Sequence, residues 1–531
     1  MKYIFNKYVI LIWLLLSIAL CFVIYTNTYS IHRGCDLVSE NDEWEHQSMA
    51  VNYAKGFGFY KLGAFAPISD YHIDACDATL PFLRKLFTKY PTEYYHRAAG
   101  FSIITGTLYQ LTGTEPYYLR LFNFVLIILS WIITCFAFIR HKKYFKLLLL
   151  ALPVYICFNF FYIDQIGDEP LLIFSLSIVF FALINWVRKP NFLFTFFLLL
   201  SLSFSVFIKT TLLFMPVFTL LIVIGLRLKK QIAGALFINA ILFAAVIIIS
   251  GKINKKHQSY AYPNQQQFHT DMIKSDWSKE DSTFIKTYHL TYRDNVNFSI
   301  DLYKQLAAYL FERQFYTKKS FLLSGQSLFL LIDGNNETCI HVPAKNIGSW
   351  MPLWKLTKTS YFYTYTEDQS PYAAISKFYL KKPYFFPLIV YCKLYAGYYW
   401  NYLFLLISAL QLSLYILLLQ RKNRLLKTVL IIGFSIILHI LLRQLFLTPI
   451  LVIGFLITSM LILIRFKNRL DRSASIFYIP YLITFYFLFL TVLMFGLNRY
   501  TCIANSMSLL IIVFLLSQMS FLLKKNHETL S

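Results

Sequence analysis

The chain has 531 residues, of which 57% are hydrophobic and only 14% are charged. Soluble domains carry about 25% charged residues, so this composition excludes a single water-soluble globule and indicates that lipid surrounds much of the chain. The formal net charge of +24 is spread over short Lys and Arg clusters between apolar runs. That distribution argues against a nucleic-acid-binding surface and is typical of a membrane protein.

Twelve apolar runs are each close to the length of about 20 residues that a membrane-spanning helix needs. The first run follows Lys2 and Lys7 and lacks a small-residue cleavage site, so we interpret it as a retained helix rather than a signal peptide. The predicted fold is an all-α polytopic membrane protein with about twelve transmembrane helices. These cover residues 8–26, 117–139, 144–162, 170–187, 191–208, 210–226, 232–250, 400–419, 425–443, 445–464, 475–496 and 505–523.

The basic residues predict the orientation of these helices. With the N-terminus in the cytoplasm, the short cytoplasmic segments contain 21 Lys and Arg residues, whereas the short outer loops contain only Lys209, Arg443 and Arg499. Short cytoplasmic loops are enriched in Lys and Arg. We therefore expect a multi-pass protein of the cytoplasmic (inner) membrane with both termini in the cytoplasm and with the two long segments 27–116 and 251–399 outside.

This topology divides the chain into three parts. Residues 1–250 form an N-terminal transmembrane module that includes the first outer loop, and residues 400–531 form a C-terminal transmembrane module. Residues 251–399 form an extracytoplasmic segment that ends in an interfacial helix. Apolar residues near helical spacing predict a second surface helix over 94–111.

Acidic residues gather in the first outer loop. Asp42 and Glu43 are predicted to begin a short helix that ends near Gly56. A carboxylate at the start of a helix can cap free backbone N–H groups. At the membrane surface it can also act as a general base. The sequence leaves both interpretations open.

A second acidic group lies in a short outer loop between two predicted spans. It contains Asp164, Asp168 and Glu169, followed by Pro170, which suits the first turn of the next helix. Acids next to hydrocarbon are costly unless they serve a cavity. The alternatives are a capped, solvated loop and a functional cavity.

Two cations lie on the same predicted side. Lys209 interrupts an apolar hairpin, and Arg499 begins the last outer turn. Such side chains either extend to lipid headgroups or bind a phosphate at the outer leaflet. Cys35 and Cys76 share the first outer loop and can form a disulfide if that loop is extracytoplasmic.

Several passages, in this order and spacing, give the chain a resemblance to a known family. It resembles the integral-membrane glycosyltransferases of the GT-C superfamily, near the protein O-mannosyltransferase and aminoarabinose transferase branch. The passages are the helix begun by Asp42 and Glu43 with 55–59 (KGFGF), 117–123 (YYLRLFN), 167–171 (GDEPL), 208–211 (IKTT), 374–384 (AISKFYLKKPY) and 498–500 (NRY). The Pro-Pro pair that many relatives carry before the surface helix is replaced here by 95–98 (YHRA).

The resemblance implies an activity and its site. The donor is a polyprenyl-phosphate-linked sugar, and the acceptor is a lipid, a glycan or a protein. Asp42 deprotonates the acceptor hydroxyl with support from Glu43, and the reaction inverts the sugar carbon. The remaining assignments are Asp164, Asp168 and Glu169 as ligands of the acceptor or of a divalent metal, and Lys209, Arg499 and Arg97 as donor-phosphate ligands. No cofactor other than such a metal is implied.

Two other functions compete with this one. A surface-polysaccharide polymerase or ligase also has about twelve spans, but it relies on Arg and His in late outer loops. A lipid-linked sugar transporter has repeated halves and ionisable residues inside its spans. The concentration of acids in the first outer loop and the scarcity of charge inside the spans favour the transferase, with membrane lipids and no nucleic acid among its partners.

Overall fold

The computed structural model describes residues 7–26, 41–58, 99–164, 166–209, 212, 215–225, 229–257, 390, 394, 398, 401–420, 425–444, 447–465, 477–493 and 504–528. Over these residues the regular structure is helical and no strand occurs, which confirms the all-α prediction. Five stretches are long and apolar enough to cross a membrane, as expected of a membrane protein. They are Pro116–Phe136, Glu169–Arg188, Tyr402–Leu419, Leu425–Arg443 and Ser506–Lys524.

The chain divides into two compact units. Unit 1 contains residues 1–258, 468–486 and 503–531, and unit 2 contains residues 259–467 and 487–502. The sequence-based modules have different boundaries, since they assign all of 400–531 to one C-terminal module.

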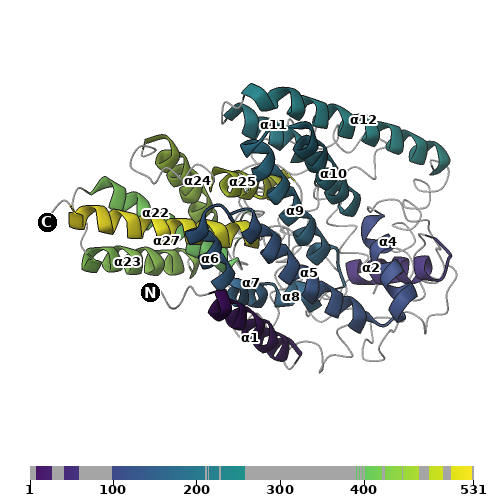
Figure 1. Ribbon diagram of the computed structural model, residues 1–531, viewed down its shortest axis with the longest axis horizontal. Coiled ribbons are helices and arrows are strands. Elements are labelled where there is room, and N and C mark those ends of the chain that lie inside the picture. Colours follow the sequence, from purple (N-terminus) through teal and green to yellow (C-terminus); the bar gives the residue numbers. More distant parts are fainter. Residues whose placement is uncertain are drawn as a thin grey trace, which may run out of the picture. The chain divides into compact units, whose positions relative to one another are not determined.

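Unit 1 contains most of the described helices (Figure 1). In chain order they are α1 (Lys7–Tyr25), α2 (Asn41–Ala54), α4 (Gly100–Thr112), α5 (Pro116–Phe136), α6 (Lys142–Leu150), α7 (Leu152–Phe158), α8 (Phe160–Asp164), α9 (Glu169–Arg188), α10 (Phe192–Ile208), α11 (Met215–Gly225), the 3-10 turn η6 (Lys229–Gln231), α12 (Ile232–His257), the first half of α25 (Tyr478–Leu493) and α27 (Asn505–Glu528).

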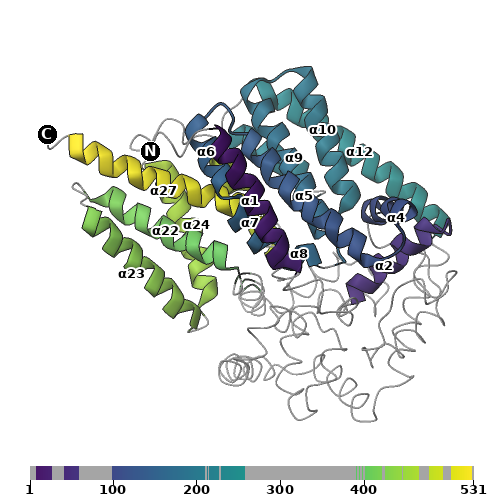
Figure 2. The same cartoon turned by 60° about the horizontal axis from the view of Figure 1, so that its bottom comes forward.

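Neighbouring helices of unit 1 form a row in which α5 packs on α9, α9 on α10 and α10 on α12 (Figure 2). The shorter helices α6 and α7 lie against α1 and α5. Two buried tryptophans anchor this core through hydrogen bonds. Trp131 Nε1 donates to the carbonyl oxygen of Leu148 at 2.8 Å, and Trp186 Nε1 donates to Thr195 Oγ1 at 2.8 Å. The apolar faces of these helices therefore meet in one packed interior.

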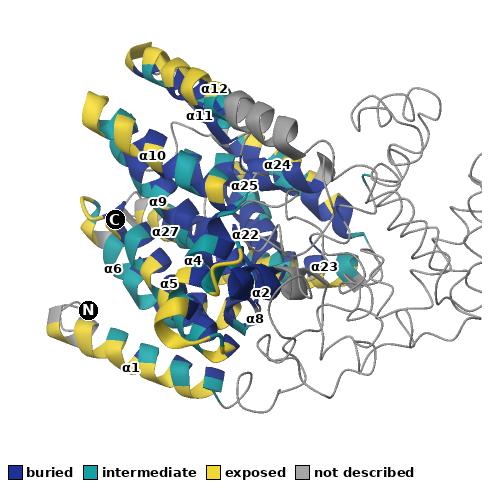
Figure 3. Cartoon of the chain, turned by 90° about the vertical axis from the view of Figure 1, so that its right-hand side faces the viewer, coloured by how far each residue is buried: buried dark blue, intermediate teal, exposed yellow. Residues whose placement is uncertain are grey.

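The exposed faces of helix α1 are themselves apolar. Helix α1 buries Ser17, Cys21 and Tyr25 at every fourth position, and its other faces expose large apolar side chains such as Leu16 and Leu20. Figure 3 shows the exposed colour along most of α1. A soluble protein rarely leaves a contiguous apolar face of this kind in water. The pattern is that of a helix with one face on protein and the others on lipid.

The span predicted over 144–162 is not one continuous helix, because the chain forms three short helices there, α6, α7 and α8. Pro153 lies in the first turn of α7, where its missing N–H interrupts the hydrogen-bond ladder. Asn159 then ends α7, since its Nδ2 donates to the carbonyl oxygen of Tyr155 at 2.7 Å. The other predicted spans each contain one described helix, although α11 is only 11 residues long.

Unit 2 contributes α22 (Tyr402–Leu419), α23 (Leu425–Gln444) and α24 (Thr448–Arg465). Hydrogen bonds between uncharged groups join these helices. Gln411 Nε2 donates to the carbonyl oxygen of Phe455 at 2.9 Å, and His439 Nε2 lies 3.0 Å from Ser408 Oγ. Such contacts are a common means of holding membrane helices together.

The predicted segment 251–399 lies outside the described residues, apart from 251–257 and three single positions. Residues 251–257 continue α12 beyond its predicted end. The interfacial helix predicted before residue 400 therefore stays a prediction.

Candidate functional site

Five helix termini of unit 1 meet at one end of the helix row. The ends of α1 and α8 and the start of α5 are joined through Tyr25, Asp164 and Arg120. The end of α10 is joined to the start of α9 through Lys209 and Asp168. The loop 164–169 contributes residues to both groups. Asp164, Asp168 and Glu169, which form the second acidic group of the sequence, therefore all lie at this end of unit 1.

Lys209 forms ion pairs with two neighbouring carboxylates. Its Nζ lies 2.6 Å from Asp168 Oδ1 and 3.6 Å from Glu169 Oε1. The three side chains are 11%, 8% and 4% exposed, respectively. We call Asp168, Glu169 and Lys209 the acid–lysine cluster. Two carboxylates and one ammonium leave it with one net negative charge when all three are ionised.

The structure argues against a capped, solvated loop at this position. Asp168 directly precedes α9, but its side chain makes no capping hydrogen bond. Asp168 and Glu169 are also buried, so the loop is not solvated. Pro170 lies in the first turn of α9 as predicted. Burying a carboxylate costs free energy unless the carboxylate is paired with a cation. The ion pairs with Lys209 therefore stabilise Asp168 and Glu169 at this position.

Gly167 makes room for one of these carboxylates. A Cβ atom on Gly167 would overlap Glu169 Oε2, which folds back over the loop. Any larger residue at position 167 would have to move the Glu169 carboxylate. The glycine therefore lets Glu169 reach Lys209.

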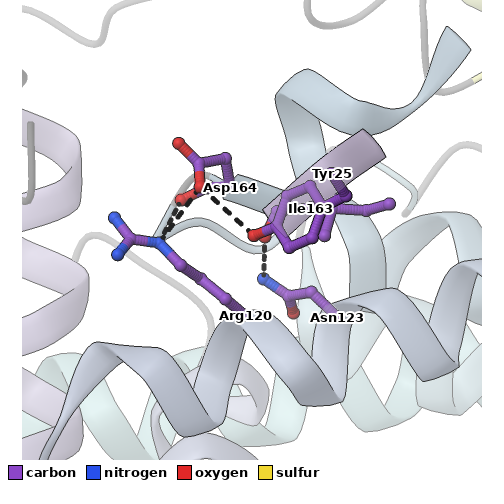
Figure 4. Close-up of polar contacts among 5 residues, drawn as sticks. All are labelled: Tyr25, Arg120, Asn123, Ile163 and Asp164. Carbon is purple, nitrogen blue, oxygen red and sulfur yellow. Dashed lines mark hydrogen bonds and ion pairs between the residues drawn. The ribbon is translucent and has the colours of Figure 1, made fainter. Parts of the chain in front are cut away.

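The residues around Asp164 are ones that the sequence did not identify as functional (Figure 4). Tyr25 from α1, together with Arg120 and Asn123 from α5, surround the last turn of α8. Arg120 and Asn123 lie within the YYLRLFN passage at the start of a predicted span, and neither residue was assigned a role there. An arginine inside an apolar run was the available signal, because such a residue needs a partner.

Helix α2 has the predicted form. It begins at Asn41 with Asp42 and Glu43 in its first turn, and it ends at Ala54, just before Gly56 at φ +82°. The side chains of Asp42 and Glu43 lie outside the described part of the chain. The general-base role of Asp42 therefore stays a prediction.

Helix α4 crosses α2 at close range. A Cβ on Gly106 would stand 2.9 Å from the carbonyl oxygen of Ala50, so the two backbones are nearly in contact. Tyr109 Oη donates to Gln47 Oε1 at 2.7 Å, and burial raises the pKa of this phenol, which keeps it a donor. The ring of His46 meets the ring of Phe101 edge-on, with centroids 4.7 Å apart.

The crossed pair of α2 and α4 rests on the end of α10. A Cβ on Gly100 would stand 2.5 Å from the carbonyl oxygen of Phe207, two residues before Lys209. Because His46 packs on Phe101 and Gly100 packs on Phe207, the first half of α2 and the end of α10 both contact the start of α4. The helices that carry the two acidic passages are thus linked through α4.

The remaining predicted site residues cannot be compared with the structure. Arg97, Arg499, Cys35 and Cys76 lie outside the described residues. For the predicted divalent metal, the described residues contain no group of three His, Cys, Asp or Glu side chains suited to hold an ion. In the acid–lysine cluster, the ammonium of Lys209 lies where a cation shared by Asp168 and Glu169 would lie.

The opposite end of the helix row is basic. Arg188 at the end of α9 donates to the carbonyl oxygen of Ala137 at 3.0 Å, and Gln231 before α12 donates to that of Val187 at 3.1 Å. These contacts bring three Lys and Arg clusters together at one end. Their members are Arg140, Lys142 and Lys146; Arg188 and Lys189; and Lys229 and Lys230.

Comparison of the chain with protein-family models, with curated proteins and with solved structures finds no match. The functional argument therefore depends on the chemistry of the chain itself.

Proposed function

We propose that this protein is a polytopic membrane glycosyltransferase of the GT-C type. It transfers a sugar from a polyprenyl-phosphate donor to a lipid, glycan or protein acceptor. The observation that carries the proposal is the acid–lysine cluster, which is buried at the end of an apolar helix row. Helix α2, which Asp42 and Glu43 begin, packs on α4, and α4 in turn contacts α10. Buried ionised groups at the end of membrane helices are expensive and mark functional sites.

The charge distribution supports the orientation that such an enzyme requires. Unit 1 carries its basic clusters at one end and the acid–lysine cluster at the other. Clusters of Lys and Arg between spans lie on the cytoplasmic side. We therefore propose twelve spans with both termini in the cytoplasm, so that the acid–lysine cluster faces the outer leaflet of the inner membrane.

In the proposed reaction, Asp42 takes the proton from the acceptor hydroxyl. The acceptor oxygen then attacks the sugar carbon from the face opposite the phosphate, and the bond between that carbon and the phosphate oxygen breaks. The products are the inverted glycoside and the lipid phosphate. Glu43 supports Asp42, while Asp168 and Glu169 orient the acceptor.

The leaving phosphate gains negative charge, and fixed cations stabilise developing charge most effectively where water is excluded. Lys209 is suited to this role, since it already lies buried at the cluster. Lys209 can bind a phosphate only if the phosphate joins Asp168 and Glu169 around its ammonium or replaces one of them. Arg97 and Arg499 complete the proposed set of phosphate ligands.

The test uses the full-length protein in lipid nanodiscs with a panel of polyprenyl-phosphate sugars and the matching polyprenyl-pyrophosphate sugars. We expect release of lipid phosphate from the monophosphate donors only. Asp42→Asn should lower turnover about 10²- to 10⁴-fold, the contribution of a general base. Glu115→Gln is the matched control, because Glu115 is an exposed carboxylate at the start of α5.

Three results would overturn the proposal. They are no turnover with any monophosphate donor, turnover with pyrophosphate donors alone, and equal turnover of Asp42→Asn and Glu115→Gln. The second result would favour the polysaccharide polymerase or ligase.

A further inference from the structure

Asp164 was predicted as a ligand of the acceptor or of a metal, but it has other partners in the structure. Tyr25 Oη donates to Asp164 Oδ1 at 3.2 Å. Arg120 Nε lies 3.4 Å from the same carboxylate oxygen and donates to the Asp164 carbonyl oxygen at 3.0 Å. One residue earlier, Asn123 Nδ2 donates to the carbonyl oxygen of Ile163 at 3.3 Å. Figure 4 shows these four contacts converging on the end of α8.

These contacts are buried and come from separate parts of the chain. The side chains of Arg120 and Asp164 are 8% and 11% exposed. Tyr25 is the last residue of α1, and Arg120 and Asn123 lie in the first turns of α5. Both the side chain and the backbone of Asp164 are bound, so the contacts fix the path of the chain and not only the carboxylate.

The backbone position of Asp164 also determines where the next two carboxylates lie. Asp168 comes only four residues after Asp164, so the two residues are joined by a short connection through which a shift at one end can be passed to the other. One end of this loop is bound by Tyr25 and Arg120, and the other end is bound by Lys209. A displacement of Asp164 would therefore move Asp168 and Glu169 relative to Lys209.

We propose that Tyr25, Arg120 and Asp164 are positioning residues that set the acid–lysine cluster, and that Asp164 is not an acceptor or metal ligand. The expected effect of these residues on turnover rests on the proposed function. Their expected effect on the position of Asp168 and Glu169 relative to Lys209 does not. The test therefore combines a chemical readout at Lys209 with turnover.

The variant Tyr25→Phe removes one hydroxyl group and keeps the ring that packs 5.9 Å from Phe124 and from Phe160. Asp164→Asn removes the charge that pairs with Arg120. Tyr155→Phe is the matched control, since Tyr155 Oη is also buried and lies 2.9 Å from Ser130 Oγ, which is outside the loop 164–169.

The first readout is the rate at which an amine-reactive ester labels Lys209 in nanodiscs, followed by mass spectrometry. Lys209 is buried against two carboxylates, so we expect slow labelling in the wild type and in Tyr155→Phe. Tyr25→Phe and Asp164→Asn should label about tenfold faster, the factor expected for the loss of one ordinary hydrogen bond.

The second readout is turnover. Tyr25→Phe should lower kcat about tenfold with little change in KM and with a melting temperature equal to that of Tyr155→Phe. Equal labelling of Lys209 in Tyr25→Phe, Asp164→Asn and Tyr155→Phe would overturn the inference, whatever the turnover. Faster labelling without turnover from any donor would support the positioning role and refute the proposed transferase.

Discussion

Units 1 and 2 both bury polar side chains between apolar helices, but the groups they bury differ. In unit 2, the buried polar residues that the structure describes are uncharged amides and hydroxyls together with His439, and Ser408 and Gln411 bond across helices. In unit 1, the buried polar residues include the charged side chains Arg120, Asp168 and Glu169. The charged residues lie where helices end, whereas Gln411 lies in the middle of α22.

This difference separates two uses of polarity in a membrane protein. Uncharged hydrogen bonds in mid-helix join helices at low cost, and either partner can be lost without exposing a charge to hydrocarbon. Ionised groups near hydrocarbon cost more and are retained where they act on a substrate or an ion. The buried charges of unit 1 therefore support our proposal that this end of unit 1 is the functional site, and they lead us to expect a structural role for the polar interior of unit 2.

The largest effect is expected at Lys209. Lys209→Ala leaves Asp168 and Glu169 buried without their cation, and breaking a buried ion pair in this way costs about 3–5 kcal/mol in the free energy of unfolding. Turnover with a polyprenyl-phosphate sugar should be lost as well. Unfolding and turnover are measured in detergent, with Lys189→Ala as the control because Lys189 is exposed at the end of α9.

A second variant separates folding from function at the same position. When Asp168→Asn and Glu169→Gln are added to Lys209→Ala, no buried charge is left uncompensated. The free energy of unfolding should recover most of the loss, while turnover should stay absent. Full stability of Lys209→Ala alone would show that the ion pairs do not compensate the carboxylates as the distances indicate.

A smaller effect is expected at Gly167. In Gly167→Ala, the new methyl group displaces the Glu169 carboxylate from its place over the loop. Misplacement of an active-site group by about 1 Å can cost up to about 100-fold in rate, whereas the displaced side chain is flexible and the fold should persist. Turnover should therefore fall about 10- to 100-fold with little change in melting temperature. Wild-type turnover would exclude Glu169 from the site.

The positions of the helices could be predicted well because hydropathy is a local property. The predicted spans 8–26 and 170–187 differ from α1 and α9 by one residue at each end. The break in 144–162 was missed because a single proline or asparagine barely changes the mean hydropathy of an apolar run. Its effect on the backbone depends on individual hydrogen bonds, such as that of Asn159.

Four charged residues at this end of unit 1 could be predicted from the sequence, but their pairing could not. Asp164, Asp168, Glu169 and Lys209 were identified because each is an ionisable group next to an apolar run. The sequence did not indicate that Lys209 would pair with Asp168 while Asp164 would pair with Arg120. That pairing depends on α10 returning to the start of α9 and on α5 passing the end of α8, and both are tertiary facts.

The smallest effect is expected in unit 2. Gln411→Leu removes hydrogen bonds from α22 to α24, and interhelical bonds of this kind average about 0.6 kcal/mol and reach about 1.7 kcal/mol. Because the change leaves no buried charge unpaired, the free energy of unfolding should fall by this amount and turnover should be unchanged. Gln411→Glu keeps the size of the side chain but introduces an acid, so at neutral pH it should destabilise the protein more than Gln411→Leu does. If Gln411→Leu instead abolished transfer at unchanged stability, the polar interior of unit 2 would belong to the active site, and the division of roles between the two units would fail.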